Sequence, residues 1–556
     1  MAYSRIRIYR LVLFFLVIAG LLVMRLFYLQ IVHGPELALE GLSIRVQELP
    51  VEVARGEILD RNRLPLTNTT QEYSVIVFPG QIGNKTSQAI DKLIPLLPLS
   101  TEQIEVGLRR LHASEYPFRL ARGINSAVAQ QVNDLQLPGI IAAAEKVRYG
   151  YGTLAAHVVG YINAADNKGV SGIEGMYDEL LRGSQPEYVA AIVDAGHSLI
   201  PGLGYKRMRL TAANQENNVV LTIDKQIQQR TEEVMDRTIV KGAVVIMRPT
   251  TGEILALASR PAFNANNLSQ YLAQGSAPLL NRAISAYQPG SVFKLVVAAA
   301  ALENRTIRMD DVFFDPGYID VNNVRFQGWD YEQSPKGRLT ITEAMAHSSN
   351  PVFIQVALNL GADKLVAMAR KLGYGSRTKL DFPGESEGNV PEADELYPGD
   401  LANLAIGQGF CEATPVQIAQ TVATIVNDGV KVEPYIVNKL TNTDGSTVKS
   451  FQAAPGARVM SRQTAEKLRT MMTAVTQYGT GQAAYVEEYG SAGKTGSAET
   501  GRINTTGKGI NHAWFAGFTP LEHPKYVIVV FVEEGMSGSN VAAPIFREIA
   551  TSILKN

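Results

Sequence analysis

A chain of 556 residues with 46% hydrophobic residues is long enough for more than one domain, each with a sizeable core. Its 52 basic residues balance 53 acidic ones, so its charge indicates no nucleic acid or other polyanion as partner. A single cysteine, Cys411, excludes internal disulfides and cysteine-based metal clusters, and none of the seven histidines stands in a His-Glu-x-x-His motif.

The N-terminus has the composition of a membrane helix. Three arginines within the first ten residues precede an uncharged stretch from Leu11 to Met24, and apolar residues continue beyond Arg25. A helix from about Ile8 to Tyr28 reaches the roughly 20 residues needed to cross a membrane, if its arginines extend to the two interfaces. No small-x-small cleavage site follows, which predicts an uncleaved anchor. Because the basic residues precede the span, we expect a cytoplasmic N-terminus and export of everything from about His33.

Residues 34–215 are expected to form a structural, non-catalytic domain. Strands are predicted at Leu49–Ala54 and Gln71–Phe78. Apolar residues at helical spacing follow Thr101, which we expect to cap a helix that reaches Leu111. Neither paired carboxylates nor clustered metal ligands occur in this part of the sequence, so nothing in it indicates catalysis.

A second domain is predicted to begin near Asn218. Val219–Ile223 is expected to be a strand, and Asp224 is expected to cap a helix that ends near Ile239. Between residues 242 and 258, two β-prone runs flank the turn sequence Arg-Pro-Thr-Thr-Gly, which predicts a hairpin.

The C-terminal region predicts the rest of the same sheet. The runs at 511–518 and 526–532 are expected to pair as strands, and residues 541–554 to close the chain as a helix. Strands at both ends with a largely helical middle are typical of one antiparallel sheet covered by helices. The two ends of this domain must therefore meet in space.

The sequence Tyr-Gln-Pro-Gly-Ser-Val-Phe-Lys, at residues 287–294, is the first candidate for chemistry. Pro-Gly precedes a run of helix formers, so a buried helix is expected to begin at about Ser291. Residues three apart share a helix face, which puts the Ser291 hydroxyl beside the Lys294 amine. Burial and the positive end of the helix dipole both favour the neutral lysine, a base that could take the serine proton.

Spacing alone does not select this serine. Ser446 and Lys449 have the same spacing, and such matches arise by chance because both residue types are common. The second pair follows Asn-Thr-Asp-Gly, which predicts a hairpin turn and an exposed strand, where nothing would desolvate the lysine. The choice of Ser291 therefore depends on its context.

Two further short motifs occur in the same domain. Ser348-Ser-Asn350 follows a helical segment and precedes Pro351, and Lys494-Thr-Gly-Ser497 is expected on a strand shortly before the strand of Trp514. Each motif is weak by itself. Ser-x-x-Lys, Ser-x-Asn and Lys-Thr-Gly in this order are close to the signature of penicillin-binding proteins and serine β-lactamases.

Along essentially its whole length the chain resembles a class B penicillin-binding protein, a membrane-anchored peptidoglycan D,D-transpeptidase. Further segments that resemble family signatures are Arg55–Asn62, Gly172–Gly183, Leu221–Asp224, Gly407–Gly409 with Thr414–Gln417, and Gly479–Gly481. Arg63 departs from the pattern, since the family commonly has glycine there, and this puts only a local turn in doubt.

This resemblance implies an α+β fold in three parts. Residues 1–33 would hold the cytoplasmic N-terminus and one transmembrane helix. Residues 34–215 would form an elongated, β-rich pedestal of the dimerisation type. Residues 216–556 would form a transpeptidase domain like that of the serine β-lactamases, an antiparallel sheet flanked by helices with a helical subdomain.

The resemblance also implies acyl transfer through a serine acyl-enzyme. Ser291 would attack the carbonyl between the last two D-alanines of a stem peptide, with Lys294 as base, and an amine of a neighbouring stem would then take the acyl group. Ser348 would relay the proton to the leaving amine, and Asn350 would position the substrate amide. β-Lactams would acylate the same serine and remain there, because they resemble the D-alanyl-D-alanine substrate.

The Lys-Thr-Gly segment would bind the substrate. Lys494 would supply positive charge, and Thr495 and Ser497 would bind the substrate carboxylate on either side of Gly496. The backbone N–H groups of Ser291 and Ser497 would form the oxyanion hole. The resemblance implies neither a metal nor a cofactor.

His347 and His512 lie beside these motifs. We interpret both as structural, because the serine–lysine scheme leaves neither of them a task.

Three other functions are compatible with the same motifs. A serine β-lactamase would turn over β-lactams rapidly, a D,D-carboxypeptidase would use water as acceptor, and a sensor would be acylated yet inert toward stem peptides. The anchor and the domain of residues 34–215 favour a cell-wall polymer as substrate.

A bifunctional synthase is disfavoured, because no acidic glycosyltransferase motif occurs between residues 35 and 215. The resemblance implies instead a membrane-embedded glycosyltransferase partner that contacts the anchor and pedestal. The expected location is the bacterial cell membrane, with a single pass and an extracytoplasmic catalytic domain.

Overall fold

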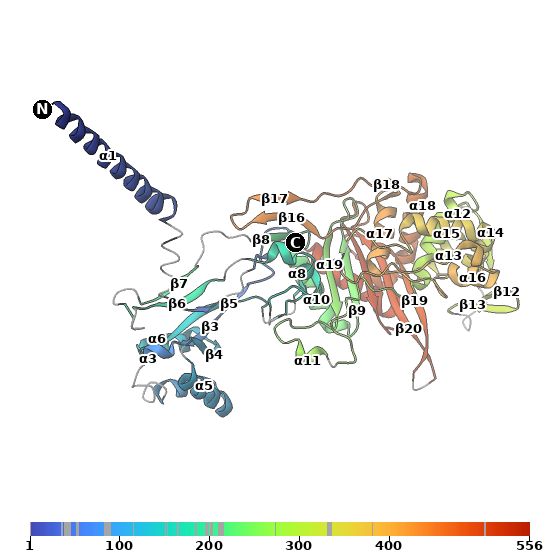
Figure 1. Ribbon diagram of the computed structural model, residues 1–556. Coiled ribbons are helices and arrows are strands. Elements are labelled where there is room, and N and C mark those ends of the chain that lie inside the picture. The colour runs from blue at the N-terminus through green and yellow to red at the C-terminus, as the bar shows by residue number, and fades with distance from the viewer. Residues whose placement is uncertain are drawn as a thin grey trace. The chain divides into compact units, whose positions relative to one another are not determined.

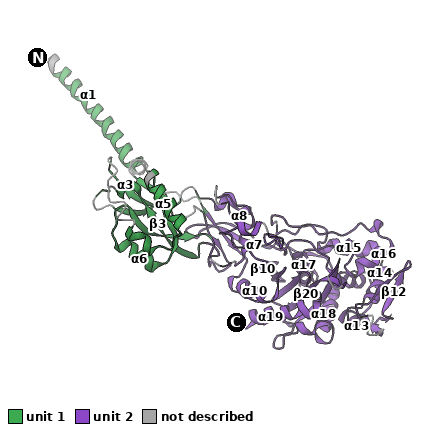
Figure 2. Ribbon diagram, turned by 90° about the horizontal axis from the view of Figure 1, so that it is seen from below, with its two compact units in different colours: residues 1–55, 68–148, 183–216 green, residues 56–67, 149–182, 217–556 purple. Residues whose placement is uncertain are grey.

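The chain folds into two compact units. The computed structural model describes residues 2–34, 37, 46–51, 55–82, 91–114, 116–150, 152, 154–163, 166–183, 186–194, 199–200, 204–209, 216–272, 274–330, 336–380, 382–504 and 507–555 (Figure 1). The first unit comprises residues 1–55, 68–148 and 183–216, and the second comprises residues 56–67, 149–182 and 217–556 (Figure 2). The sequence predicts one boundary near residue 215, whereas two earlier segments pack within the second unit.

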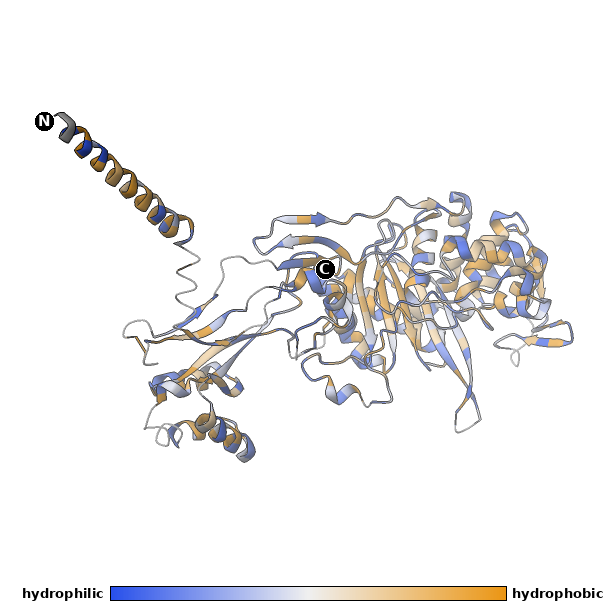
Figure 3. Cartoon of the chain, viewed as in Figure 1, coloured by the Kyte–Doolittle hydropathy of each residue, from blue (hydrophilic) through white to orange (hydrophobic). Residues whose placement is uncertain are grey.

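The first helix has the length and composition to cross a membrane. α1 (Ala2–Phe27) continues into a π-helical turn, η1 (Tyr28–Val32), and the apolar span runs from Arg5 to Val32 over 28 residues. Most of this helix has the colour of apolar residues (Figure 3), and its apolar side chains from Ile6 onward are exposed. Such exposure is unfavourable in water and favourable in lipid. The span Ile8–Tyr28 expected from the sequence lies within it.

Two three-stranded sheets, ordered β4-β3-β5 and β1-β6-β7, form the first unit. The strands are β1 (Val46–Pro50), β3 (Thr70–Val77), β4 (Phe118–Ile124), β5 (Ile140–Val147), β6 (Tyr188–Ile192) and β7 (Tyr205–Met208). The strand predicted at Gln71–Phe78 is confirmed as β3. The strand predicted at Leu49–Ala54 overlaps the end of β1, and residues 52–54 lie outside the described residues.

The helices of this unit are α3 (Pro79–Ile82), η3 (Ile94–Leu96), α5 (Thr101–Ala113) and α6 (Ser126–Asp134). The predicted cap, Thr101, is wrong by one residue. Ser100 caps α5, because its hydroxyl accepts from the N–H of Gln103 while the Gln103 side chain accepts from the N–H of Ser100. A capping box needs Glu or Gln three residues after the cap, and only Ser100 has one.

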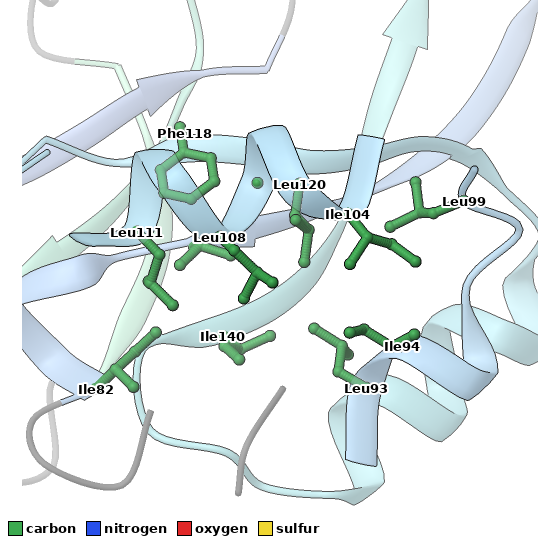
Figure 4. A pocket seen from close by; sticks show the side chains of 12 residues that line it. Ile82, Leu93, Ile94, Leu99, Ile104, Leu108, Leu111, Phe118, Leu120 and Ile140 are labelled. Carbon is green, nitrogen blue, oxygen red and sulfur yellow. The ribbon is translucent and has the colours of Figure 1, made fainter. Parts of the chain in front are cut away.

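A small apolar cavity lies under α5, between Leu108, Leu111 and the β4 residue Phe118 (Figure 4). Its volume is about 20 Å³. Ligand pockets are more than ten times larger, so this cavity is a packing void.

The second unit is organised around a five-stranded antiparallel sheet with the order β10-β9-β21-β20-β19. Its strands are β9 (Gly242–Met247), β10 (Ile254–Arg260), β19 (Ala492–Ile503), β20 (Gly509–Thr519) and β21 (Tyr526–Val532). The predicted hairpin and the predicted C-terminal strand pair are therefore confirmed, and strands from both ends of the domain meet. β19 is an edge strand, so one of its sides is left open for other partners.

Alternation along the strands builds a core on each face of this sheet. Val245 and Met247 of β9 pack into the cluster that contains the central helices, whereas Val244 and Ile246 pack against α10 (Lys225–Thr238) and α19 (Ala543–Leu554). Successive strand residues point to opposite faces, so an uninterrupted apolar run covers both. Asp224 caps α10 as predicted, since its side chain accepts from two backbone N–H groups.

The structure describes further helices and short helical turns in this unit. They are α7 (Ala156–Val159), α8 (Gly172–Met176), α9 (Asp178–Leu181), α11 (Ser269–Leu272), η4 (Gly290–Phe293), α12 (Lys294–Glu303), α13 (Ile341–Ala346), α14 (Asn350–Leu360), α15 (Ala362–Leu372), η6 (Ala393–Glu395), α16 (Pro398–Ala405), α17 (Pro415–Val426), α18 (Arg462–Gln477), η7 (Gln482–Ala484) and η8 (Gly538–Ala542).

Smaller sheets complete the second unit. A four-stranded sheet has the order β17-β16-β8-β2 and three pairs are β11-β14, β12-β13 and β15-β18. Their strands are β2 (Ile58–Leu59), β8 (Asn217–Leu221), β11 (Val312–Asp315), β12 (Tyr318–Val321), β13 (Val324–Gln327), β14 (Gly337–Thr340), β15 (Val430–Lys431), β16 (Val437–Asn442), β17 (Thr447–Ser450) and β18 (Ala457–Arg458).

Arg63, which stands where the family commonly has glycine, lies in the turn after β2. Asp60 is fully buried, and its carboxylate accepts from the N–H groups of Asn62, Leu64 and Lys225. This turn requires a φ of +63° at Arg63, which is a left-handed conformation that favours glycine. The family's usual glycine fits this backbone, and Arg63 is strained in it.

We expect Arg63→Gly to stabilise the second unit by about 0.5–1 kcal/mol, because glycine adopts a positive φ without strain. Thermal unfolding of the detergent-purified chain measures the effect. Arg63→Ala is the control, since it removes the same side chain but keeps Cβ. Equal unfolding temperatures for the Gly and Ala variants would contradict the strain argument.

Candidate active site

Ser291 lies on the tight turn that leads into α12, a deeply buried helix of the second unit. η4 is a 3-10 turn that precedes α12, so the helix predicted to begin at Ser291 starts as a 3-10 turn and becomes α-helical at Lys294. Gly290 has a φ of +55°, and a Cβ at this position would lie 2.8 Å from the carbonyl oxygen of Ser497. Only glycine therefore allows this turn to pack against β19.

Lys294 is fully buried beneath Ser291. Its Nζ donates to the Ser348 carbonyl oxygen at 2.7 Å, to Asn350 Oδ1 at 2.7 Å and to Ser348 Oγ at 3.3 Å. Burial, and next the charge of Lys494, hold the pKa of Lys294 well below that of an ordinary lysine. No hydrogen bond joins Ser291 Oγ to Lys294 Nζ in this structure, although both residues are described.

The loop between α13 and α14 presents Ser348 and Asn350 to Lys294. Ser348 has a φ of +57°, and Ser349 caps α14 by accepting from the N–H of Val352. Ser349 Oγ also donates to the buried carboxylate of Asp315 at 2.6 Å. These bonds fix the loop, so that Ser348 Oγ and Asn350 Oδ1 both face the lysine.

Lys494 approaches the same hydroxyl from β19. Its Nζ lies 2.8 Å from Ser348 Oγ and 2.9 Å from the Thr495 carbonyl oxygen. Burial lowers the pKa of Lys494 to about 7. The Ser348 hydroxyl therefore bridges two lysine side chains, a position from which it can pass a proton.

The remaining residues of the Lys-Thr-Gly motif line the open side. Thr495 Oγ1 lies 2.7 Å from Thr480 Oγ1, and Ser497 Oγ accepts from the N–H of Gly538 at 3.1 Å. Gly496 has no room for a side chain, because its Cβ would lie 2.9 Å from the Pro289 carbonyl oxygen. Both hydroxyls stay at the surface of the groove.

The backbone of Ser497 faces Ser291. Its carbonyl oxygen lies against Gly290 and so points away from β20, toward the open edge of the sheet. The N–H and C=O of one strand residue point to the same side, so the N–H of Ser497 also points to that edge. The structure thus directs this N–H toward the turn that carries Ser291.

These groups line one large groove of about 950 Å³. The predicted site residues on its surface are Ser291, Ser348, Asn350, Thr495 and Ser497. Lys294 and Lys494 lie behind that surface, where they are buried. Three motifs that are about 55 to 200 residues apart in the sequence therefore meet around one hydroxyl.

Several residues of this site are not indicated by any of the three sequence motifs. Thr480, which contacts Thr495, lies within Gly479–Gly481, and the resemblance of that segment to the family is what could have indicated it. Asp315 has no sequence signal that we can identify. Trp329, which borders the groove and donates to the His347 carbonyl oxygen at 3.1 Å, could have been found as one of only two tryptophans.

Other serines with suggestive spacing lie in different surroundings. Ser446 is bonded to Asp444 in an exposed turn, and β17, which carries Lys449, is exposed throughout. One Gly-x-Ser-x-Gly sequence is present, at Gly384–Gly388, but Ser386 lies in a loop rather than on a strand-to-helix elbow.

The two histidines beside the motifs have structural contacts. His512 Nδ1 accepts from the N–H of Glu534 at 3.1 Å, and the His347 carbonyl oxygen accepts from Trp329. Burial lowers the pKa of both histidines. These contacts agree with the structural interpretation.

Two family models match the chain. The model described as the penicillin-binding protein transpeptidase domain matches residues 242–551, which is more than half of the sequence, and the model described as the penicillin-binding protein dimerisation domain matches residues 50–199. The chain belongs to the class B penicillin-binding proteins. It is an enzyme of the serine acyltransferase type.

Named relatives match this penicillin-binding protein over nearly its whole length. Stage V sporulation protein D of Bacillus subtilis is 30% identical and covers 97% of this chain and 84% of its own. Peptidoglycan D,D-transpeptidase MrdA of Acinetobacter baumannii is 30% identical, with 97% and 87% covered. Penicillin-binding protein PbpB of Mycolicibacterium smegmatis is 32% identical, with 96% and 87% covered.

A solved structure also matches this penicillin-binding protein. The D,D-transpeptidase domain of peptidoglycan glycosyltransferase from Eggerthella lenta is 28% identical with a TM-score of 0.63. The match covers 90% of this chain and 98% of that one. The expected α+β transpeptidase fold is therefore confirmed.

Proposed function

We propose that this chain cross-links peptidoglycan stem peptides as a D,D-transpeptidase, with Ser291 as the nucleophile. One observation supports this most directly, namely the Ser348 hydroxyl between the buried amines of Lys294 and Lys494, next to Ser291. Family membership supports the reaction class.

In the first step, Ser291 Oγ attacks the carbonyl between the last two D-alanines, and its proton passes to the amine of Lys294. Lys294 must be neutral to accept that proton, and its lowered pKa provides the neutral form. The proton then passes through Ser348 to the nitrogen of the leaving D-alanine. An ester joins Ser291 to the remaining stem.

Asn350, at the start of α14, and the residues of β19 position the substrate. Asn350 binds the substrate amide, and Lys494 attracts the terminal carboxylate, which Thr495 and Ser497 bind beside Gly496. The N–H groups of Ser291 and Ser497 stabilise the oxyanion, with a typical contribution of a few kcal/mol per donor. In the second step, the amine of a neighbouring stem attacks the ester, and Ser291 regains its proton.

β-Lactams acylate Ser291 in the same way and remain attached. Their bicyclic nucleus resembles D-alanyl-D-alanine, and opening of the lactam ring leaves no free leaving group. Slow loss of the ester then explains inhibition.

Location and partner belong to the same proposal. In this proposal the chain crosses the bacterial cell membrane once, with its basic N-terminus in the cytoplasm and residues 34–215 and 216–556 outside, and the apolar helix Arg5–Val32 supports a single span. Residues 34–215 act as the pedestal. A membrane-embedded glycosyltransferase contacts the anchor and pedestal and supplies the glycan strands.

Detection of cross-linked product distinguishes a transpeptidase from the alternative functions. We expect the full chain, given glycan strands with pentapeptide stems, to produce muropeptide dimers that mass spectrometry detects after glycan digestion. Prior acylation with penicillin should abolish them. Release of D-alanine without dimers would instead indicate a D,D-carboxypeptidase, and rapid hydrolysis of the penicillin would indicate a β-lactamase.

A further inference from the structure

The groove surface carries two formally charged side chains among its described residues, Arg325 and Glu499. Arg325 is already paired, since its guanidinium makes two 2.9 Å bonds to Asp320 and lies 4.1 Å from the ring centroid of Tyr318. Glu499 has no cation within 4 Å among the residues that the structure describes. It is therefore the one unneutralised charge on this surface.

Glu499 lies on β19, two residues beyond Ser497. Both side chains are exposed, whereas Ala498 between them is buried. Alternate strand residues share a face and are about 7 Å apart. The Glu499 side chain therefore lies about 7 Å farther along β19 than Ser497, whose backbone N–H points toward the turn of Ser291.

The direction of the substrate follows from the charges of this strand. If the proposed function holds, the terminal carboxylate lies near Lys494 and Thr495, and the scissile carbonyl lies near Ser291 and Ser497. The peptide then runs antiparallel to β19 with its N-terminal side toward Glu499. The residue before the acylated D-alanine comes next, and a long side chain on it can reach the carboxylate.

We propose that Glu499 is a specificity-determining residue that selects donor peptides with a free ammonium on the side chain of the residue before the acylated D-alanine. On β19, Lys494 would attract the terminal carboxylate of the substrate. Glu499, farther along the same strand, would attract an ammonium on the side chain two residues before that terminus. Complementary charge of this kind acts mainly on specificity. An acylated or amidated side chain would lose the attraction.

The test compares three penicillins on the full chain in detergent at low ionic strength. They share one nucleus and differ at the α-carbon of the acyl side chain, which carries an ammonium, a hydrogen or a carboxylate. This side chain occupies the place of the residue before D-alanyl-D-alanine. The interaction of two partly exposed charges is modest, so we expect the ammonium compound to acylate about fivefold to tenfold faster than the carboxylate compound.

Glu499→Gln should reduce that ratio to within about twofold of unity, because the amide keeps the size and polarity of the side chain without its charge. Glu487→Gln is the matched control. It makes the same chemical change at an exposed glutamate outside the groove and should keep the wild-type ratio. High salt should weaken the preference in the wild type.

The outcomes separate this inference from the proposed function. An unchanged ratio in Glu499→Gln, or no preference in the wild type, overturns the role of Glu499 while acylation itself supports the function. Failure of all three penicillins to acylate a folded wild type overturns both, since the direction of the peptide rests on acylation at Ser291. A donor peptide with a free side-chain amine, compared with its acetylated form, should give the same order as the penicillins.

Discussion

Ser291→Ala is expected to abolish labelling by a fluorescent penicillin completely. Ser291 lies on the turn before α12 and lines the groove, and without its hydroxyl as nucleophile no ester forms. The substitution removes one half-buried hydroxyl that makes no hydrogen bond to a described residue, so the fold should be unaffected. Gel fluorescence of the detergent-purified chain measures the label.

The chain provides a matched control for this experiment. Ser446→Ala removes the serine of a second Ser-x-x-Lys sequence, and it should label as the wild type does, since this serine lies in an exposed turn. Label that persists in Ser291→Ala, or that disappears in Ser446→Ala, would overturn the assignment. Label that forms and then falls off quickly would indicate a β-lactamase.

Lys294→Met is expected to slow acylation by about 10²- to 10⁴-fold, the range typical for loss of a general base. Methionine fills a similar volume but cannot accept a proton. The second-order rate constant for penicillin acylation measures the effect, and Lys449→Met is the control. Because Asn350 Oδ1 and the Ser348 carbonyl lose a donor, near-ultraviolet circular dichroism must first show that the variant is folded.

The pH dependence of the wild type tests the same base without any substitution. Protonated Lys294 cannot accept the serine proton, so acylation should be absent at low pH and rise as this lysine loses its proton, well below the ordinary value of 10.5. Burial lowers the pKa of Lys494 to about 7, so its positive charge disappears at higher pH and the rate should fall again. A rise centred near pH 10.5 would mean that Lys294 is not the desolvated base.

Much of the fold follows from local pattern. The apolar run at 242–247, its turn and the run that follows predict a hairpin, and the structure has it as β9 and β10. Local sequence also predicts the pair of C-terminal strands, and the helix α10 with its Asp224 cap. Local rules failed where neighbouring residues competed, as at Ser100 and Thr101, where the glutamine three residues after Ser100 decides the cap.

Local sequence pattern did not predict which segments pack within which unit. The sequence predicts a continuous domain of residues 34–215, yet β2 pairs in parallel with β8, and residues 56–67 pack within the second unit. Parallel pairing joins strands that are far apart in the chain, so no local signal reveals it.

By itself the sequence determined the reaction class, because the three motifs occur in a fixed order and each residue type suits its role. Spacing alone could not choose among serines, since Ser-x-x-Lys occurs at five places, the others beginning at Ser376, Ser446, Ser491 and Ser552, and the choice of Ser291 rested on the order of the three motifs. Only the tertiary structure buries Lys294 against Ser348 and Asn350, and it also buries Lys494, the lysine of the Ser491 match, on the same Ser348 hydroxyl. Desolvation makes a lysine basic enough to take a proton, and desolvation depends on packing between distant segments rather than on spacing along the chain.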